Sequence, residues 1–227
     1  MLLDLTVRSL NAETGLRFDP RALVIAGWAG RDKEAMEHHI RELEALGVAR
    51  PAVTPTYYRV SAARLTTAGT VEASGEQSSG EVEPLILAHD GRLYVGVGSD
   101  HTDREVETYG VAVSKQMCDK PIAATVWPFE EVADHWDELV LRSFIHEDGV
   151  RVTYQEGKVS ALLDPRDTIA GFGGGKPLAD GLAMLCGTLP AIGGVRASSR
   201  FEAELDDPVL GRTLSFGYAI EPLPIAG

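Results

Sequence analysis

Five side chains that could bind a metal ion or move a proton fall within ten residues, directly after an apolar segment. They are Asp100, His101, Asp103, Glu105 and Glu107. Acidic side chains that enter an apolar region need a positive partner, because an unpaired charge is costly to remove from water. Oxygen ligands suit Mg²⁺, Mn²⁺ or Ca²⁺ better than zinc. The stretch therefore indicates a divalent-metal site.

The pair Glu105 and Glu107 is the centre of this interpretation. The pattern over residues 105–113 predicts a strand, on which both carboxylates project from one face, about 7 Å apart. They would then bind the metal, while His101 and Asp103 orient ligands or a bound water molecule. The alternative is an acidic edge strand with both glutamates in water, where charged side chains mostly lie.

A predicted helix supplies candidates for proton transfer. Apolar residues recur at helical spacing between Asp32 and Leu46, and Asp32 can cap the start of the helix. His39 and Glu42 lie three residues apart on its surface. A carboxylate beside a histidine stabilises the imidazolium form, so the pair could take a proton from water. In the alternative interpretation His39 packs in the core and the neighbouring His38 is the functional residue.

The composition excludes several classes of function. The 34 acidic and 21 basic residues give a formal net charge of -13, which would repel a nucleic-acid backbone. No apolar stretch approaches the roughly 18 residues of a membrane helix, and the first residues lack a signal-peptide pattern. We therefore expect a cytoplasmic protein with no nucleic-acid or membrane partner. Cys118 and Cys186 are too few for a disulfide framework and are expected to be buried.

The elements that would position these residues are mostly strands. Glycine and proline are spread along the chain and the runs between them are short and nearly alternating, which predicts a strand-rich α+β fold. A second helix is expected from Phe129 to about Trp136. Late strands are expected over residues 150–154, 182–187, 201–205 and 214–220. A solvated hairpin or loop is expected over residues 66–84, whose glutamates are Glu72, Glu76, Glu81 and Glu83.

The order of the motifs resembles that of the fumarylacetoacetate hydrolase superfamily over most of the chain. Small members open with an apolar strand, a Gly-rich turn and a helix carrying His-x-x-Glu, as residues 22–27, 30–31 and 39–42 do here. The family's Glu-x-Glu, followed by an apolar strand and a lysine, is similar to Glu105-Val-Glu107 and Lys115. Its later aspartate and arginine look like Asp137 and Arg142, and its turn near the C-terminus is similar to the turn at Thr188.

The resemblance implies a fold and a cofactor. The fold would be a fumarylacetoacetate hydrolase-like mixed β-sandwich or roll with few short helices, forming a single catalytic domain over residues 1–227. Its first 60 residues would carry His39 and Glu42, and the protein would form a homodimer. Mg²⁺ or Mn²⁺, with Ca²⁺ as a further option, would bind to Glu105, Glu107 and Asp137. The alternatives to the third of these ligands are Glu130, Glu131 and Asp134.

The resemblance also implies an activity, namely hydrolysis or cleavage of a small 2-oxo or β-dicarbonyl carboxylic acid through a metal-stabilised enolate. His39, assisted by Glu42, would activate water, while Arg142, Lys115 and Thr188 would bind the anionic end of the substrate. The family's lysine-bearing loop after the third ligand is missing, so Lys115 or Lys120 would take its place. Two alternatives remain open: a metal-dependent amide or lactone hydrolase, and a non-catalytic metal-binding or ligand-binding β domain.

Overall fold

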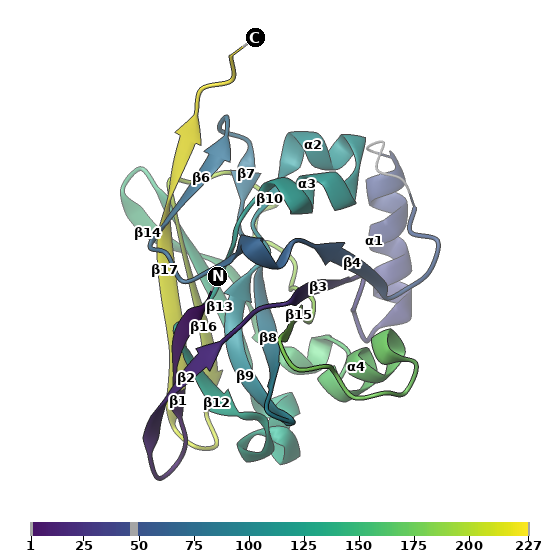
Figure 1. The fold of residues 1–227 in the computed structure, drawn as a ribbon. Helices are drawn as coiled ribbons and strands as arrows, with labels where there is room; N and C mark the ends of the chain where they lie inside the picture. Colours follow the sequence, from purple (N-terminus) through teal and green to yellow (C-terminus); the bar gives the residue numbers. More distant parts are fainter. Residues whose placement is uncertain (1, 46–49, 227) are drawn as a thin grey trace.

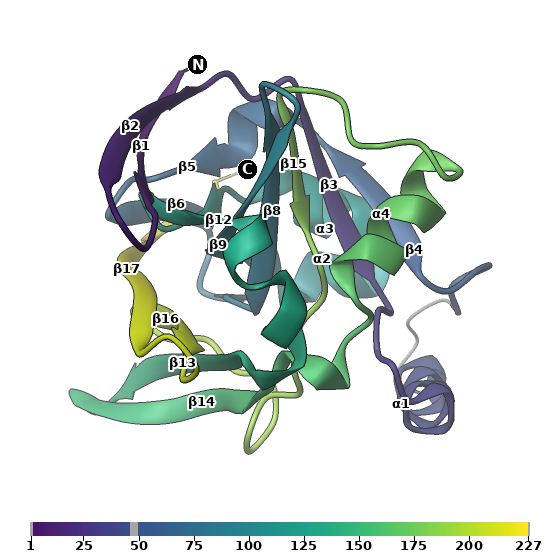
Figure 2. The same ribbon diagram turned by 90° about the horizontal axis from the view of Figure 1, so that it is seen from below.

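Two large β-sheets pack against each other in the computed structural model, which describes residues 2–45 and 50–226. The eight-stranded sheet has the order β2-β1-β12-β9-β8-β15-β3-β4. Its strands are β1 (Leu3–Arg8), β2 (Glu13–Phe18), β3 (Ala22–Gly27), β4 (Thr56–Val60), β8 (Val82–His89), β9 (Arg92–Ser99), β12 (Thr125–Pro128) and β15 (Leu182–Leu185). Figure 2 shows this sheet curving from β1 and β2 through β8 and β15 to β3 and β4.

The second large sheet has the order β14-β13-β16-β17-β6. Its strands are β6 (Thr70–Ser74), β13 (Val140–Glu147), β14 (Val150–Lys158), β16 (Arg200–Asp207) and β17 (Arg212–Leu223). Two short pairs complete the strands: β5 (Leu65–Thr66) with β11 (Lys120–Pro121), and β7 (Ser78–Ser79) with β10 (Thr102–Asp103). The β7–β10 pair lies next to β8 and β9 in the chain and frames the site described below.

The α-helices lie on the side of the molecule away from β14 and β17 (Figure 1). The α-helices are α1 (Lys33–Ala45), α2 (Arg104–Tyr109), α3 (Val111–Met117) and α4 (Pro165–Gly173). The 3₁₀ helices are η1 (Ala62–Arg64), η2 (Phe129–Glu131), η3 (Ala133–Glu138) and η4 (Val159–Ala161). None of the helices in the described ranges is long and apolar enough to cross a membrane.

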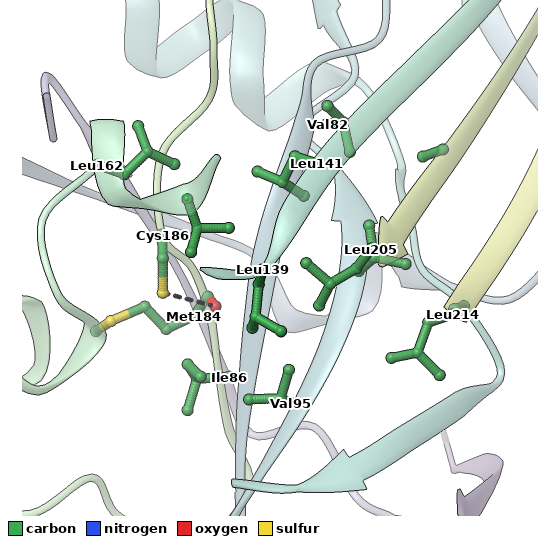
Figure 3. Packing of buried hydrophobic residues seen from close by; sticks show 14 of the residues in the cluster. Val82, Ile86, Val95, Leu139, Leu141, Leu162, Met184, Cys186, Leu205 and Leu214 are labelled. Carbon is green, nitrogen blue, oxygen red and sulfur yellow. Dashed lines mark hydrogen bonds between the residues drawn. The ribbon is translucent and has the colours of Figure 1, made fainter. Parts of the chain in front are cut away.

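The central strand β8 is buried on both faces. Ile86 belongs to the larger apolar cluster between the two sheets, together with Val95 and Leu205 (Figure 3). Leu85 and Leu87 point the other way, into a second cluster on the inner side of the curved sheet. Side chains on a strand alternate between faces, so a strand with two covered faces needs a continuous apolar run.

The strand-rich α+β fold predicted from the sequence is confirmed. The four late strands are present as β14, β15, β16 and β17, and Cys118 and Cys186 are both buried. Helix α1 begins as predicted, because Asp32 accepts hydrogen bonds from the amides of Glu34 and Ala35 at 2.9 and 3.0 Å. The helix predicted after Pro128 is present as two 3₁₀ segments, η2 and η3.

Two predictions about local structure were wrong. The strand predicted over residues 105–113 is the helix pair α2 and α3, separated by Gly110. Asp103 causes this difference, because its carboxylate accepts a hydrogen bond from the Val106 amide at 2.9 Å and caps α2. The segment 66–84 is not a solvated loop, since it contains β6, β7 and the first residues of β8, and Glu83 within it is 2% exposed.

Candidate metal centre and cavity

Three carboxylates gather where β8 begins and β9 ends. One oxygen atom from each of Glu81, Glu83 and Asp100 lies within 4.8 Å of the others. Glu81 and Glu83 stand on either side of Val82, so they share one face at the start of β8 while Val82 enters the core. Asp100 follows Ser99, which pairs with Val82 in the antiparallel register of β8 and β9. Strand pairing therefore brings Asp100 next to glutamates that lie 17 and 19 positions earlier in the chain.

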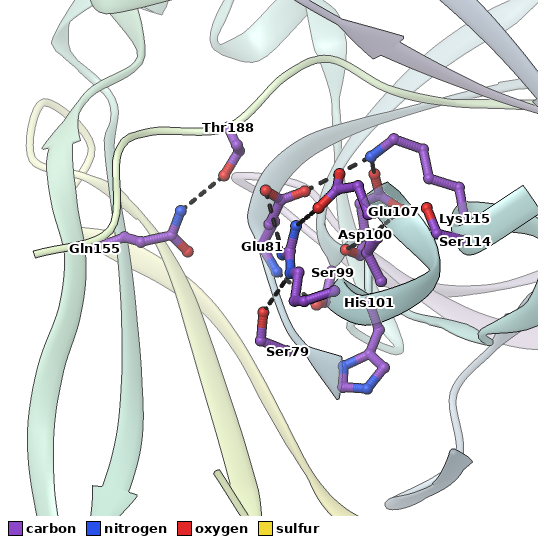
Figure 4. Close-up of polar contacts among 12 residues, drawn as sticks. Ser79, Glu81, Ser99, Asp100, His101, Glu107, Ser114, Lys115, Gln155 and Thr188 are labelled. Carbon is purple, nitrogen blue, oxygen red and sulfur yellow. Dashed lines mark hydrogen bonds and ion pairs between the residues drawn. The ribbon is translucent and has the colours of Figure 1, made fainter. Parts of the chain in front are cut away.

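Two cations border this cluster (Figure 4). The Lys115 ammonium, at the end of α3, donates a hydrogen bond to Asp100 and lies 3.7 Å from Glu81. The Arg104 guanidinium lies 3.3 Å from Glu81, and it donates to Glu107 at 2.9 Å and to Ser79 at 2.7 Å. Helices α2 and α3 thus supply positive charge to carboxylates that come from the strands.

A third cation, Lys120, lies next to Asp100 and is fully buried. Its ammonium donates to the carbonyl oxygens of His101 at 2.6 Å and Cys118 at 2.9 Å, and also to that of Lys115. It lies 3.4 Å from an oxygen of Asp100. Lys120 therefore ties together the segment after β9 and the C-terminal end of α3.

The pKa values of Glu83, Asp100 and Lys115 are shifted from their usual values. Burial and the neighbouring Asp100 raise the pKa of Glu83 well above its usual value. Burial acts in the same direction on Asp100, but Lys115 and Lys120 outweigh it and hold the pKa of Asp100 below its usual value. Burial acts to lower the pKa of Lys115, yet the adjacent carboxylates raise it, so this side chain stays an ammonium.

The donor set fits a hard divalent cation. All three groups offer carboxylate oxygens, which Mg²⁺, Mn²⁺ and Ca²⁺ prefer. Glu83 and Asp100 are 2% and 0% exposed, and burial of carboxylates so close together favours a shared cation. Among the acidic, histidine and cysteine side chains that the structure describes, Glu81, Glu83 and Asp100 are the group of three whose ligand atoms lie close enough together to share an ion.

The cluster opens onto a cavity of about 1010 Å³. Glu81, Glu83, Arg104 and Lys115 line it, as does Thr188. The Thr188 hydroxyl donates to the Val82 carbonyl at 2.9 Å and accepts from Gln155 at 2.8 Å. The Gly187 amide before it donates to Glu83 at 2.8 Å. The turn after β15 thus forms the wall of the cavity next to the carboxylates.

The three carboxylates predicted as metal ligands do not come together. Glu105 and Glu107 lie on α2, and residues two positions apart on a helix do not share a face. Glu107 lines the cavity but pairs with Arg104, and Asp137 is bound by Arg31 through two hydrogen bonds of 2.9 and 2.8 Å. The alternative third ligands do not join the group either: they are Glu130, Glu131 and Asp134.

The other predicted site residues divide into two groups. Lys115 and Thr188 lie at the cavity, as described above. Arg142 does not line it and instead pairs with Glu156 on β14 at 2.9 Å. His101 is fully buried and its ring contacts Tyr218 and Ser78, while Asp103 is the cap of α2, so neither side chain lines the cavity.

The predicted proton-transfer pair lies on α1, as expected from its spacing. The side chains of His39 and Glu42 fall outside the part of the chain that the structure describes. Helix α1 itself borders the cavity, because Ala35, Met36 and His38 line it. The role of His39 and Glu42 therefore stays a prediction.

The sequence contains a signal for the clustered carboxylates, because the tripeptide Glu-Val-Glu occurs twice, at 81–83 and at 105–107. The first copy is followed by the apolar run Pro84-Leu-Ile-Leu-Ala88, which is typical of a buried strand. The second is followed by only two residues before Gly110, and glycine is disfavoured inside a strand. The residues after each tripeptide were the signal that could have distinguished the two copies.

Comparison with solved structures identifies the class of fold. Yeast ynq8, described as a fumarylacetoacetate hydrolase family protein, is 15% identical, with 92% of this chain and 96% of that chain covered and a TM-score of 0.62. 2-Keto-3-deoxy-D-arabinonate dehydratase complexed with magnesium and 2,5-dioxopentanoate is 17% identical, with coverages of 91% and 75% and a TM-score of 0.58. 4-Oxalocrotonate decarboxylase from Pseudomonas putida G7, complexed with calcium and acetate, is 15% identical, with coverages of 91% and 78% and a TM-score of 0.55.

The chain therefore has the fumarylacetoacetate hydrolase fold, as its sequence motifs predicted. A search of curated proteins gives no significant match. Residues 26–218 match the family described as "Protein of unknown function (DUF2848)". The protein belongs to that family.

Proposed function

We propose that the protein is a divalent-metal-dependent hydrolase or lyase that acts on a small 2-oxo or β-dicarbonyl carboxylic acid. The observation that carries the proposal is the group Glu81, Glu83 and Asp100 in the wall of a large cavity, beside Lys115 and Arg104. The proposal is supported by two proteins of the same fold, a dehydratase and a decarboxylase, that were solved with magnesium and with calcium.

Glu81, Glu83 and Asp100 would hold Mg²⁺ or Mn²⁺, with Ca²⁺ as a further candidate. A bound divalent ion supplies positive charge that stabilises negative charge developing on a keto oxygen. Around it, Lys115 and Arg104 provide charged donors that can bind a substrate carboxylate. Because a metal ion held by the carboxylates and the two neighbouring cations would make the local charge positive, an anionic substrate is compatible with the net charge of -13.

Proton transfer in this proposal belongs to His39, assisted by Glu42 on the same helix. The support is the position of α1, whose residues Ala35, Met36 and His38 line the cavity. A water molecule activated there would attack a carbonyl carbon, and the bond to the neighbouring carbon would break. If no water molecule is held next to the substrate, the same enolate chemistry would give decarboxylation.

The two Glu-Val-Glu copies allow a matched test. EDTA-treated wild type, E81Q/E83Q and E105Q/E107Q would be titrated with Mg²⁺, Mn²⁺, Ca²⁺ and Zn²⁺, with and without oxalate, and the melting temperature measured. Specific binding to the native state raises the melting temperature by mass action. We expect Mg²⁺ or Mn²⁺ to stabilise wild type and E105Q/E107Q, more strongly with oxalate, and to have no effect on E81Q/E83Q.

Two further measurements complete the test. Circular dichroism checks that each variant folds, and hydrolysis of acetylpyruvate is followed by the loss of its enol absorbance. The proposal fails if metals leave the wild-type melting temperature unchanged. It also fails if E81Q/E83Q responds to metal as the wild type does.

A further inference from the structure

We infer that the substrate carries an aromatic group, so that the site acts on aryl-substituted 2-oxo acids in preference to short aliphatic ones. This inference rests on the proposed function and adds a substrate class to it. It starts from the size of the cavity. At about 1010 Å³, the cavity is much larger than an acid of three to five carbon atoms requires.

The charged part of the cavity wall beside the carboxylate cluster includes Glu81, Glu83, Arg104 and Lys115. A largely apolar part comes from the segment before α1, from α1 itself, from β4 and from the segments after η4 and β15. This part also contains the polar side chains of Arg31, Asp32 and His38. Its members include Trp28, Met36, Tyr58, Leu162, Leu189 and Val195. An acid bound at the charged part would therefore extend its remaining atoms over an apolar surface.

The aromatic rings of this surface lie next to the charged part. The Trp28 indole donates a hydrogen bond to the Tyr58 hydroxyl at 3.2 Å, which fixes the two side chains relative to each other. The Tyr58 ring lies 5.8 Å from the Lys115 ammonium, which in turn contacts Asp100. An acid that pairs with Lys115 would therefore lie beside the Tyr58 ring.

The backbone at Trp28 is unusual and points to the same conclusion. Trp28 has φ of 58°, a left-handed conformation that is rare and costly for a bulky side chain. The conformation places an aromatic ring in the cavity wall directly after β3. Residues held in such conformations concentrate at ligand sites, where the surrounding structure compensates for the strain.

Gly27 leaves the space that the Tyr58 ring occupies beside Trp28. A Cβ atom at Gly27 would lie 2.6 Å from the Tyr58 ring, so a side chain there would displace the ring. Tyr58 faces Ile25 in the register of β3 and β4, one position from the pair formed by Ala26 and Tyr57. The end of β3 is thus shaped to let Tyr58 and Trp28 lie together.

The reaction for such a substrate can be written in full for an aroylpyruvate. Water adds to the carbonyl carbon that bears the aryl ring, and the bond between this carbon and the adjacent CH₂ carbon breaks. The electron pair goes to the CH₂ carbon, which takes up one proton from the added water. The products are an arenecarboxylate, pyruvate and one released proton. No oxidant or reductant is required.

Binding of phenylpyruvate and pyruvate provides the test, because it does not depend on turnover. Dissociation constants would be measured by calorimetry with saturating Mg²⁺ for wild type, W28A and W28F. We expect phenylpyruvate to bind wild type about 10-fold more tightly than pyruvate. W28A should remove most of this preference while changing the dissociation constant for pyruvate by less than about twofold, and W28F should keep most of the preference.

Turnover gives a second measurement on the same variants. Benzoylpyruvate should have a higher kcat/KM than acetylpyruvate with wild type and W28F, and W28A should reduce the difference. Equal binding of phenylpyruvate and pyruvate to wild type overturns the inference and leaves the proposed function standing. W28A weakening both acids alike also overturns it, because Trp28 would then be structural. If neither acid binds, the proposed function fails and the inference fails with it.

Discussion

At the scale of single residues, Lys120 is the side chain on which the geometry of the carboxylate cluster most depends. It has no exposure to water, and its ammonium binds three backbone carbonyls as well as approaching Asp100. Burial lowers its pKa, and the nearby Asp100 carboxylate acts against that shift. Lys120 thus acts as an internal cation that fixes the backbone directly after Asp100 and at the C-terminal end of α3.

Replacement of Lys120 by methionine should destabilise the protein by about 2–4 kcal/mol, because three buried carbonyl oxygens lose their donor. The free energy of unfolding from urea denaturation measures this effect. K158M is the matched control, since Lys158 pairs with Glu138 at the surface and is 55% exposed. The control should change stability by less than about 1 kcal/mol. Equal effects of the two substitutions would contradict the role given to Lys120.

Glu202 on β16 gives a prediction about pH. The Arg200 guanidinium, and then Arg151 and His146, lower the pKa of Glu202 from 4.5 to about 2 despite its partial burial. A carboxylate with a lowered pKa in the folded state stabilises the protein above its unfolded pKa, and this stabilisation is lost as the pH falls from about 4.5 to about 2. E202Q should therefore cost about 1–2 kcal/mol at pH 7 and progressively less below pH 4.5.

Unfolding of wild type, E202Q and E76Q at several pH values between about 3 and 7 checks the sign of this effect. Glu76 is exposed and serves as the control. Its substitution should change stability by less than about 0.5 kcal/mol at every pH. A constant difference between wild type and E202Q across the range would show that the lowered pKa does not contribute to stability.

At the scale of elements, α2 shows how one cap can decide between a helix and a strand. Asp103 is 4% exposed and caps α2 through the Val106 amide. D103A should lower the free energy of unfolding by about 1 kcal/mol, because the amide loses its acceptor. D103N keeps an accepting oxygen and should recover at least half of this loss. Urea denaturation compares the two variants, and equal losses would mean that the cap does not stabilise α2.

The elements also show what could be predicted from the sequence. Helix α1 was predictable because its cap, Asp32, and its apolar stripe are local signals. The strand order was not, since the pairing of β8 with β9 and the parallel pairing of β15 with β3 join distant segments. The strand-rich class followed from the short alternating runs between glycines and prolines. The fumarylacetoacetate hydrolase-like fold followed from the order of several motifs, and this inference holds even though one motif was placed on the wrong kind of element.

The candidate site was predicted in part. Lys115 and Thr188 were identified as site residues, and both line the cavity. The metal ligands were predicted at Glu105 and Glu107, whereas the carboxylates that cluster belong to the other Glu-Val-Glu copy, because the acidic residues around Glu81 and Glu83 outweighed the apolar run that follows them. Burial of Glu83 follows from the tertiary structure, in which the nearby Lys115 ammonium and the Gly187 amide favour its charged form. The residues next to Glu83 in the sequence do not reveal these partners, because Lys115 and Gly187 lie far from it in the chain.

At the scale of the whole molecule, the site lies where the two large sheets are joined by buried polar groups. Gln155 on β14 accepts hydrogen bonds from the Val82 amide at 3.0 Å and from Ser143 at 2.8 Å, and it donates to Thr188. The Tyr218 hydroxyl on β17 contacts Ser99 at 2.8 Å at the end of β9. The five-stranded sheet therefore supports the two strand ends that carry the carboxylates.

The position of Trp28 has a consequence for optical spectroscopy. The chain has three tryptophans, and the other two, Trp127 and Trp136, are 0% and 3% exposed within the core. Trp28 is the one that lines the cavity, in hydrogen-bond contact with Tyr58. Its indole emission is sensitive to a ring stacked against it and to the water that the ring displaces. The unlabelled protein thus carries a fluorescent reporter at the place where a ligand would bind.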